Sequence, residues 1–233
     1  MDVDYIPRMI TYLVSMLMCL TVHEYAHAAV AFWLGDDTAS SQGRMSLNPL
    51  VHIDPIGTIA MPVIGSISGV ALFGWAKPVP TNPVRYSRRF RGKRISMNAG
   101  LAMVAAAGPL SNLVFALVLA MGLRLISHVF PPIDAQMPGY TLAMRVLVVN
   151  VGLFVFNLLP LPPLDGSRIV YWLMRDKHRP IMDLLARNTP LVFIGMLLLM
   201  QTRWFGAVMY VPIGLIFDGL NALFDIQPFF RFL

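Results

Sequence analysis

Residues 8–34 read RMITYLVSMLMCLTVHEYAHAAVAFWL, an apolar stretch with a histidine–glutamate–histidine motif in its second half. An α-helix rises about 1.5 Å per residue, so this stretch can cross the roughly 30 Å hydrocarbon core of a bilayer. Gly35, Asp36 and Asp37 follow it as a helix stop and then charge. We therefore predict a membrane-spanning helix over residues 8–34, with His23, Glu24 and His27 inside it.

The rest of the chain has the same apolar character. Of its 233 residues, 57% are hydrophobic and only 13% are charged, and the mean hydropathy is +0.65. A soluble domain of this size has no interior large enough for so much apolar sequence. Further stretches near spanning length occur at residues 95–127, 141–159 and 191–217. The sequence predicts an all-α polytopic membrane protein with about four transmembrane helices, in one domain over residues 1–233.

Residues 56–76 are also apolar but differ from an ordinary spanning helix. Pro62 and several glycines, Gly65 and Gly69 among them, interrupt the segment, with β-branched residues between them. This pattern favours a re-entrant loop or a β-hairpin that dips into the membrane, where protein or a wet cavity shields the backbone. The alternative is a poor second spanning helix.

Basic residues are concentrated in two segments, residues 77–94 and 164–190, and the net charge is +6. In a membrane protein this pattern indicates cytoplasmic loops rather than nucleic-acid binding. If residues 56–76 return to the side they left, both basic segments are cytoplasmic. The ends of the first and third spanning helices then meet at that same face. We expect a multi-pass protein of the plasma or inner membrane, in contact with the lipid bilayer, with its active site toward the cytoplasm.

The first apolar stretch is not expected to be a cleaved signal peptide. It runs well past the length of a signal core and carries the histidine motif itself. Cys19 is the one cysteine; it says nothing about disulfides, and its place in an apolar helix predicts a buried residue without a chemical role.

The motif His23-Glu24-Tyr25-Ala26-His27 is an HExxH pattern. Residues i and i+4 share one helix face, so His23 and His27 can hold one metal ion between them. Glu24 can then act as general base on water activated by the metal. Titratable groups inside a membrane segment are costly and usually functional. The motif indicates a metal-dependent hydrolase with a membrane-embedded active site.

A catalytic zinc usually takes three protein ligands, and Asp165 is the candidate for the third. It lies in Asn157–Gly166, NLLPLPPLDG, at the end of the third apolar segment. The prolines force the backbone out of regular helix, which lets a side chain turn toward a partner helix. The alternative is that Asp165 is the N-cap of a helix that begins at Gly166.

Together these motifs resemble the site-2 protease family of intramembrane zinc metalloproteases. HEYAH at residues 23–27 and NLLPLPPLDG at 157–166 carry the resemblance. Three blocks between them agree in order: NPLVHIDPIGT at 48–58, GWAKPVP at 74–80 and GPLSN at 108–112. The chain is similar to the compact prokaryotic form without a PDZ domain.

The resemblance implies one Zn2+ per chain, held by His23, His27 and Asp165, with Glu24 as general base. It implies a catalytic core over about residues 8–170, followed by a C-terminal helix at about 191–217.

The resemblance also implies residues that position the substrate. Asn157 matches a polar residue near the site, and Asn112 closes a small-residue motif facing the catalytic helices. Residues 56–76, with Gly65 and Gly69, match a membrane-dipping β-region that presents an edge to an unwound substrate.

The function expected from these features is hydrolysis of a peptide bond in or near a transmembrane segment of a membrane protein or peptide, as in regulated intramembrane proteolysis. Two alternatives use the same residues: a metal or ion transporter with a polar pathway, and an inactive scaffold of the same fold. The sequence leaves open whether the chain forms a homo-oligomer.

Overall fold

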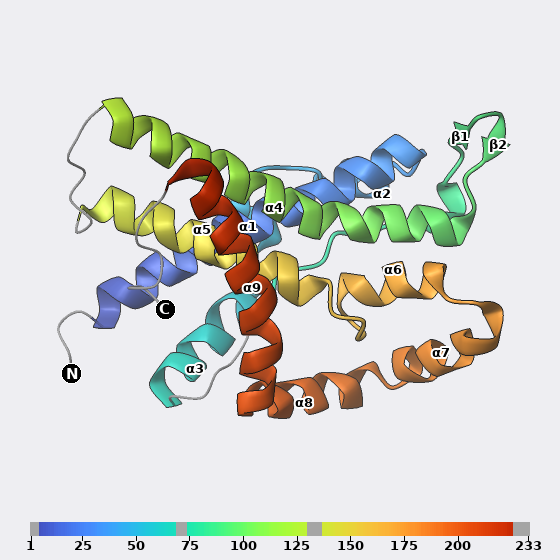
Figure 1. Ribbon diagram of the computed structural model, residues 1–233. Helices are drawn as coiled ribbons and strands as arrows, with labels where there is room; N and C mark the ends of the chain where they lie inside the picture. The colour runs from blue at the N-terminus through green and yellow to red at the C-terminus, as the bar shows by residue number, and fades with distance from the viewer. Residues whose placement is uncertain (1–4, 69–73, 130–136, 226–233) are drawn as a thin grey trace.

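The structure is a computed structural model, and it describes residues 5–68, 74–129 and 137–225 (Figure 1). Its elements in chain order are α1 (Tyr5–Leu34), α2 (Thr38–Ser41), η1 (Pro49–His52), η2 (Pro55–Ala60), α3 (Met61–Ser68), η3 (Pro83–Arg85), β1 (Arg89–Phe90), β2 (Lys93–Arg94), α4 (Met97–Val129), α5 (Pro138–Asn157), α6 (Asp165–Leu173), η4 (Asp176–His178), α7 (Arg179–Arg187), α8 (Thr189–Met200) and α9 (Arg203–Phe224). The turns η1, η3 and η4 are 3-10 helices, and η2 is a π-helix.

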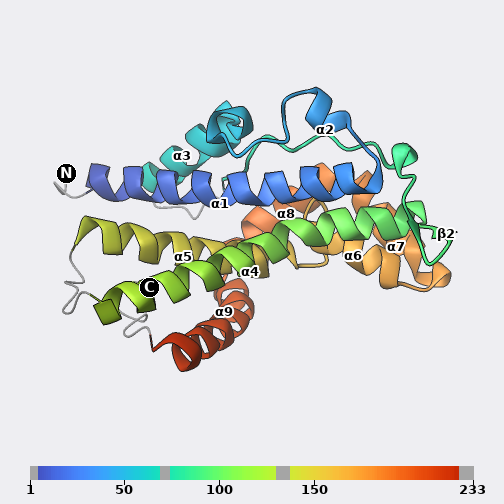
Figure 2. The same ribbon diagram turned by 90° about the horizontal axis from the view of Figure 1, so that it is seen from above.

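Three long helices, α1, α4 and α5, form the centre of the molecule (Figures 1 and 2). α1 and α5 run in the same direction and α4 runs against them, while α9 crosses the bundle on one side. Fully buried alanines of α4, Ala116 and Ala120, let the helices approach closely. Leu147 and Val151 of α5 and Phe217 of α9 pack into the same cluster. A second cluster includes Leu20 of α1 and Leu153 of α5, so α1 and the end of α5 meet beside α4.

Four described helices are long and apolar enough to cross a membrane. They are Met9–Leu34 of α1, Met97–Val129, Pro138–Asn157 and Arg203–Phe224. A stripe of large apolar side chains, each 52–63% exposed, runs along the outer face of α4 at Leu110, Val114, Val118, Met121 and Leu125. This helical spacing on an outward face suits contact with lipid. The chain is an all-α polytopic membrane protein, as the composition predicts.

The first three predicted spanning helices are confirmed, with boundaries shifted by a few residues. The fourth prediction, a single helix over residues 191–217, is wrong. Thr189–Met200 and Arg203–Phe224 are separate helices. Thr202 is the N-cap of the second, because its Oγ1 accepts from Phe205 N at 3.3 Å. Arg203 therefore begins α9 and does not lie in mid-helix.

The predicted β-hairpin within residues 56–76 is also wrong over its described part. Residues 55–60 form the π-helix η2 and residues 61–68 form α3. Asp54 starts the helical run, because its Oδ1 accepts from Ile56 N at 3.0 Å and Gly57 N at 2.7 Å. Pro55 at the first helical position adds a second start signal. Among the described residues, strand pairing is confined to β1 and β2.

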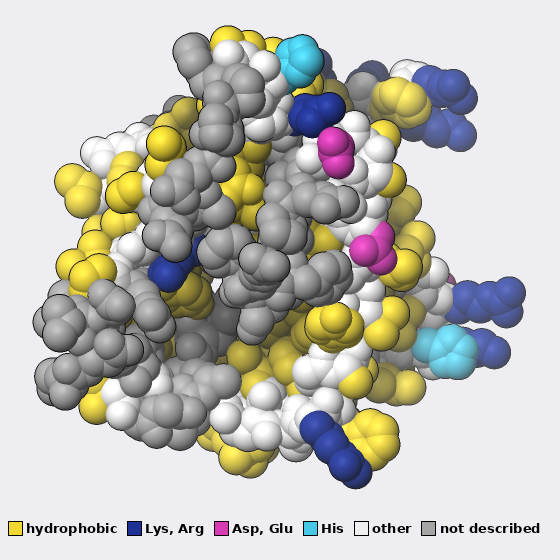
Figure 3. Space-filling model, turned by 60° about the vertical axis from the view of Figure 1, so that its left-hand side comes forward, with side chains coloured by type: hydrophobic (Ala, Val, Ile, Leu, Met, Phe, Trp, Pro, Cys, Tyr) yellow, Lys and Arg dark blue, Asp and Glu magenta, His cyan; other side chains and the backbone are white. Residues whose placement is uncertain are grey.

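The two basic segments lie at one end of the bundle. β1–β2, α6 and α7 all lie at the right of Figure 1, where α1 ends and α4 begins. Figure 3 brings the left-hand end forward: among the side chains coloured there, hydrophobic ones predominate, and the densest Lys and Arg side chains lie at the right-hand margin. The ends of α1 and α5 that carry the histidine motif and the proline-rich turn point the same way, toward the basic end.

Candidate metal centre

The two histidines of α1 face one point. His23 and His27 are one helical turn apart, and their Nε2 atoms lie 3.0 Å from each other. Their rings meet edge to face, and His23 is only 4% exposed. The helix periodicity therefore places both imidazoles where the sequence predicts.

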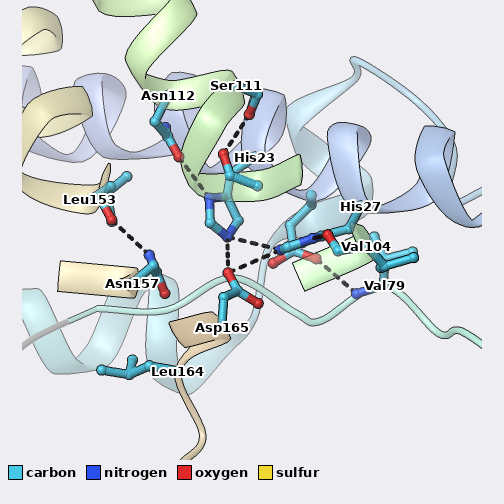
Figure 4. Close-up of polar contacts among 12 residues, drawn as sticks. His23, His27, Val79, Val104, Ser111, Asn112, Leu153, Asn157, Leu164 and Asp165 are labelled. Atoms are coloured by element: carbon cyan, nitrogen blue, oxygen red, sulfur yellow. Dashed lines mark hydrogen bonds and ion pairs between the residues drawn. The ribbon is translucent and has the colours of Figure 1, made fainter. Parts of the chain in front are cut away.

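Asp165 completes the group from a second part of the chain. α5 ends at Asn157, and prolines in the turn that follows supply no N–H to continue the helix. Gly166 packs directly on the turn, because a Cβ at this position would lie 2.3 Å from Leu158 O. Asp165 Oδ2 then lies 3.2 Å from His23 Nε2 and 3.3 Å from His27 Nε2 (Figure 4).

The alternative role of Asp165 as an N-cap is wrong. Asp165 is the first residue of α6, and Leu164 occupies the N-cap position.

Hydrogen bonds at the far side of each ring fix the histidine tautomers. His27 Nδ1 lies 2.7 Å from Val104 O, which can only accept, so Nδ1 carries the proton. His23 Nδ1 lies 2.6 Å from Asn112 Oδ1. The Asn112 amide is oriented by its Nδ2, which donates to Cys19 O at 3.2 Å and Asn150 Oδ1 at 2.8 Å. Both rings therefore present an Nε2 lone pair to the shared point.

This arrangement fits a metal ion. Two imidazole lone pairs and a carboxylate oxygen converge, and the ligand atoms of the three residues all lie within 4.8 Å of one another. Without a cation such lone pairs repel one another. Two histidines and a carboxylate are a common catalytic zinc set, with a further position left for water or substrate. Each Nδ1–H donates to an oxygen, Asn112 Oδ1 for His23 and Val104 O for His27, and such outer partners are usual for histidines that bind zinc.

Glu24 lies beside the group and is held by the backbone. Its Oε2 accepts from Val79 N at 2.8 Å. Val79 stands between Pro78 and Pro80, so its N–H is the one backbone donor between Lys77 and Thr81. This contact orients the carboxylate of Glu24 beside the group through one of its two oxygens.

The group opens into a cavity of about 370 Å³. The cavity is lined from α1, residues 75–81, α4, the end of α5, α6 and α8, with His23, Glu24, His27, Val79, Asn157 and Asp165 in its wall. Trp75 and Phe193 of α8 form part of the wall and meet edge to face, with ring centroids 5.7 Å apart. An apolar cavity with a few convergent polar groups is the usual form of a substrate site.

Of the four residues predicted to position the substrate, one lines the cavity. Asn157 lines the cavity, and its Nδ2 donates to Leu153 O at 3.1 Å. Asn112 is fully buried behind His23, lies 2.6 Å from its Nδ1 through Oδ1, and does not line the cavity. Gly65 is buried in α3 and is not part of this cavity wall. Gly69 lies outside the described residues.

Sequence reasoning missed contacts made by backbone atoms. Val79 N–H and Val104 O have no side-chain signature, although the two prolines around Val79 mark a peptide with a single donor. It also missed Arg168, which lies one helical turn after Asp165 and lines the same cavity.

Comparisons with known proteins find relatives that are named as zinc metalloproteases. A protein of Bacillus subtilis (strain 168) named "Putative zinc metalloprotease YwhC" is 42% identical over 160 residues, which cover 67% of this chain and 66% of that protein. A protein of Mycobacterium tuberculosis (strain H37Rv) named "Putative zinc metalloprotease Rip2" is 30% identical over 198 residues, 83% of this chain and 69% of that protein. The chain belongs to the site-2 protease family.

This chain spans about two thirds of the length of these site-2 protease family relatives. No protein-family model and no solved structure matches the chain. Zinc is the cofactor that fits the group formed by His23, His27 and Asp165.

Proposed function

We propose that this chain is a zinc endopeptidase that hydrolyses a peptide bond in or near a transmembrane segment of a membrane protein. The observation that carries the proposal is the position of the zinc-fitting group. Two of its members lie in a spanning helix of the bundle, the third begins α6, and all three open into one cavity. A hydrolytic site at that place suits a substrate that is itself in the membrane.

Each residue of the group has a distinct role in this proposal. His23, His27 and Asp165 hold zinc, which when bound polarises a carbonyl and makes water a stronger acid. Glu24 takes the proton from the attacking water and later passes it to the leaving amine. Val79 N–H holds one oxygen of Glu24, so the other is free to face the reacting atoms.

The substrate must be unwound, because a helical backbone hides its carbonyls. The helical residues 55–68 present no edge for strand addition. Residues 74–82 are non-helical, and five of them line the cavity: Trp75, Ala76, Pro78, Val79 and Thr81. We place the unwound segment between residues 76–81 and the Asn157 side of the cavity, where the Asn157 amide can position it.

The proposed orientation places the site toward the cytoplasmic face of the cell membrane. The basic segments lie at the end of the bundle toward which α1 and α5 run (Figure 1). Cytoplasmic segments of membrane proteins carry an excess of Lys and Arg. Water would then reach the group from the cytoplasm.

The experiment that tests the function is cleavage in proteoliposomes. The probes are single-span proteins with one apolar segment, in an unmodified form and with a central Asn-Pro that weakens the helix. We expect cuts within the span or next to it, faster in the weakened form, lost on chelation and restored by zinc. Cuts confined to soluble segments, or no cut by zinc-loaded protein, would contradict the proposal.

A further inference from the structure

Arg44 is a buried cation outside the metal group. It lies between α2 and η1 and is 8% exposed. Its Nη2 donates to Lys77 O at 2.6 Å and to Pro78 O at 3.3 Å. Its Nε is buried without a hydrogen-bond partner, and within the described parts of the chain it forms no ion pair. Burying an unpaired charge costs free energy, so a buried arginine at this position suggests a functional role.

Both acceptors of Arg44 belong to the segment that reaches Glu24. Pro78 O belongs to the same planar peptide as the Val79 N–H that donates to Glu24 Oε2 at 2.8 Å, and Lys77 O belongs to the peptide before it. Pro78 has a fixed φ, so holding the carbonyls on its two sides leaves the Val79 N–H little freedom of direction. A single peptide group, Pro78–Val79, thus lies between Arg44 and the proposed general base.

Other contacts hold the same segment further upstream. Lys77 N donates to His52 O at 2.9 Å, and Trp75 N donates to Gly57 O at 3.2 Å. These contacts fix residues 75–77, where the segment packs on η1 and η2. In the described structure, Arg44 is the side chain that donates to the carbonyls of Lys77 and Pro78, and it is a charged donor. Hydrogen bonds from a charged donor are stronger than neutral ones, so we expect Arg44 to restrain the position of these carbonyls.

We propose that Arg44 is a positioning residue for the general base: it fixes the carbonyls of residues 77–78, which directs Val79 N–H and thereby the Glu24 carboxylate. Arg44 does not touch the reacting atoms, so its effect on the reaction passes through this backbone segment. The inference rests on the proposed function for its kinetic consequence. The structural link from Arg44 to Glu24 stands apart from it and is tested separately.

The kinetic test compares Arg44→Met with Arg44→Lys and the wild type. Loss of an outer partner of a catalytic group typically costs about 10–100-fold in activity, and we expect that loss in kcat for Arg44→Met. KM should change little and zinc content should be unchanged, because neither the cavity wall nor the ligands lose a contact. Arg44→Lys should recover part of the loss, since an ammonium can still donate to Lys77 O. Added guanidinium ions should raise the kcat of Arg44→Met and leave the kcat of the wild type unchanged.

The matched control is Arg85→Met. Arg85 is exposed and pairs with Asp37 near the same end of the bundle, so this change removes an equal charge without touching residues 77–79. It should leave kcat unaltered. Full kcat in Arg44→Met, or an equal loss in the control, would overturn the proposal. A loss of kcat that parallels a loss of bound zinc would also overturn it.

The second measurement needs no activity. Hydrogen exchange at the Val79 amide should become faster in Arg44→Met and in Glu24→Ala, and stay slow in Arg85→Met. Slow exchange in Arg44→Met would overturn the link from Arg44 to Glu24. If the wild type cuts no membrane substrate while this exchange pattern holds, the proposed function fails and the positioning contact remains.

Discussion

A Glu24→Gln variant should lose about 100- to 10,000-fold in proteolytic activity, the usual contribution of a general acid–base group. The amide oxygen of glutamine can still accept from Val79 N–H, so the side chain should keep its place. Glutamine cannot take a proton from water. The loss should therefore appear in kcat, with zinc content near that of the wild type.

Zinc content and cleavage rate measured on the same preparation separate the outcomes. Activity retained in Glu24→Gln would remove Glu24 as the base. Zinc lost together with activity would mean that Glu24 supports the metal and not the proton transfer. A wild type that cuts nothing but moves ions, with flux retained in Glu24→Gln, would favour the transporter alternative.

A Gly108→Ala substitution should weaken zinc binding by about 10–100-fold, the range seen when the surroundings of a ligand are disturbed. α4 passes so close to α1 that a Cβ at this position would lie 2.5 Å from His27 Nε2 and 2.6 Å from His23 Cε1. The rings cannot swing away freely, because each is held by its Nδ1 hydrogen bond. Competition with a chelating dye measures the change in affinity.

The matched control for this prediction is Gly122→Ala on the same helix. A Cβ at Gly122 meets nothing within 4 Å. Both changes gain the same helix propensity, roughly 1 kcal/mol per Gly to Ala exchange, so the difference between them isolates the contact with the rings. Equal zinc affinity in the two variants would show that the α1–α4 approach does not constrain the ligands.

Much of the site could be predicted from the sequence because its key side chains follow local rules. His23 and His27 share a face through helix periodicity alone. Asp165 follows prolines that must end a helix, and a carboxylate placed there needs a partner. Both predictions concern side chains whose chemistry is visible in the sequence.

The contacts that orient these side chains could not be predicted in the same way. Val79 N–H, Val104 O and the close approach at Gly108 involve backbone atoms brought together by packing of distant segments. A sequence shows which residue is a glycine, but not which ring lies over it. The resemblance implies that Asn112 helps to position the substrate, whereas the helix packing directs its side chain to His23.

The segment of residues 56–76 shows a local signal that was outweighed. Its glycines and β-branched residues favour a hairpin, whereas Asp54 and Pro55 form a helix start. The capping bonds of Asp54 satisfy two backbone N–H groups that a hairpin in an apolar setting would have to pair elsewhere. In the fourth segment, Gln201, Thr202 and Arg203 are the polar interruption that hydropathy averaging passes over.

The most direct test of the metal centre is zinc per chain in the purified wild type, measured beside an Asp165→Ala variant. We predict about one zinc in the wild type, as for a three-ligand catalytic site. In the variant, loss of a direct ligand should lower affinity by more than the roughly 10–100-fold typical of an outer partner, so little zinc should survive purification. Zinc retained at one per chain in Asp165→Ala, or no zinc in a metal-preserving preparation of the wild type, would contradict a site shared by α1 and α6.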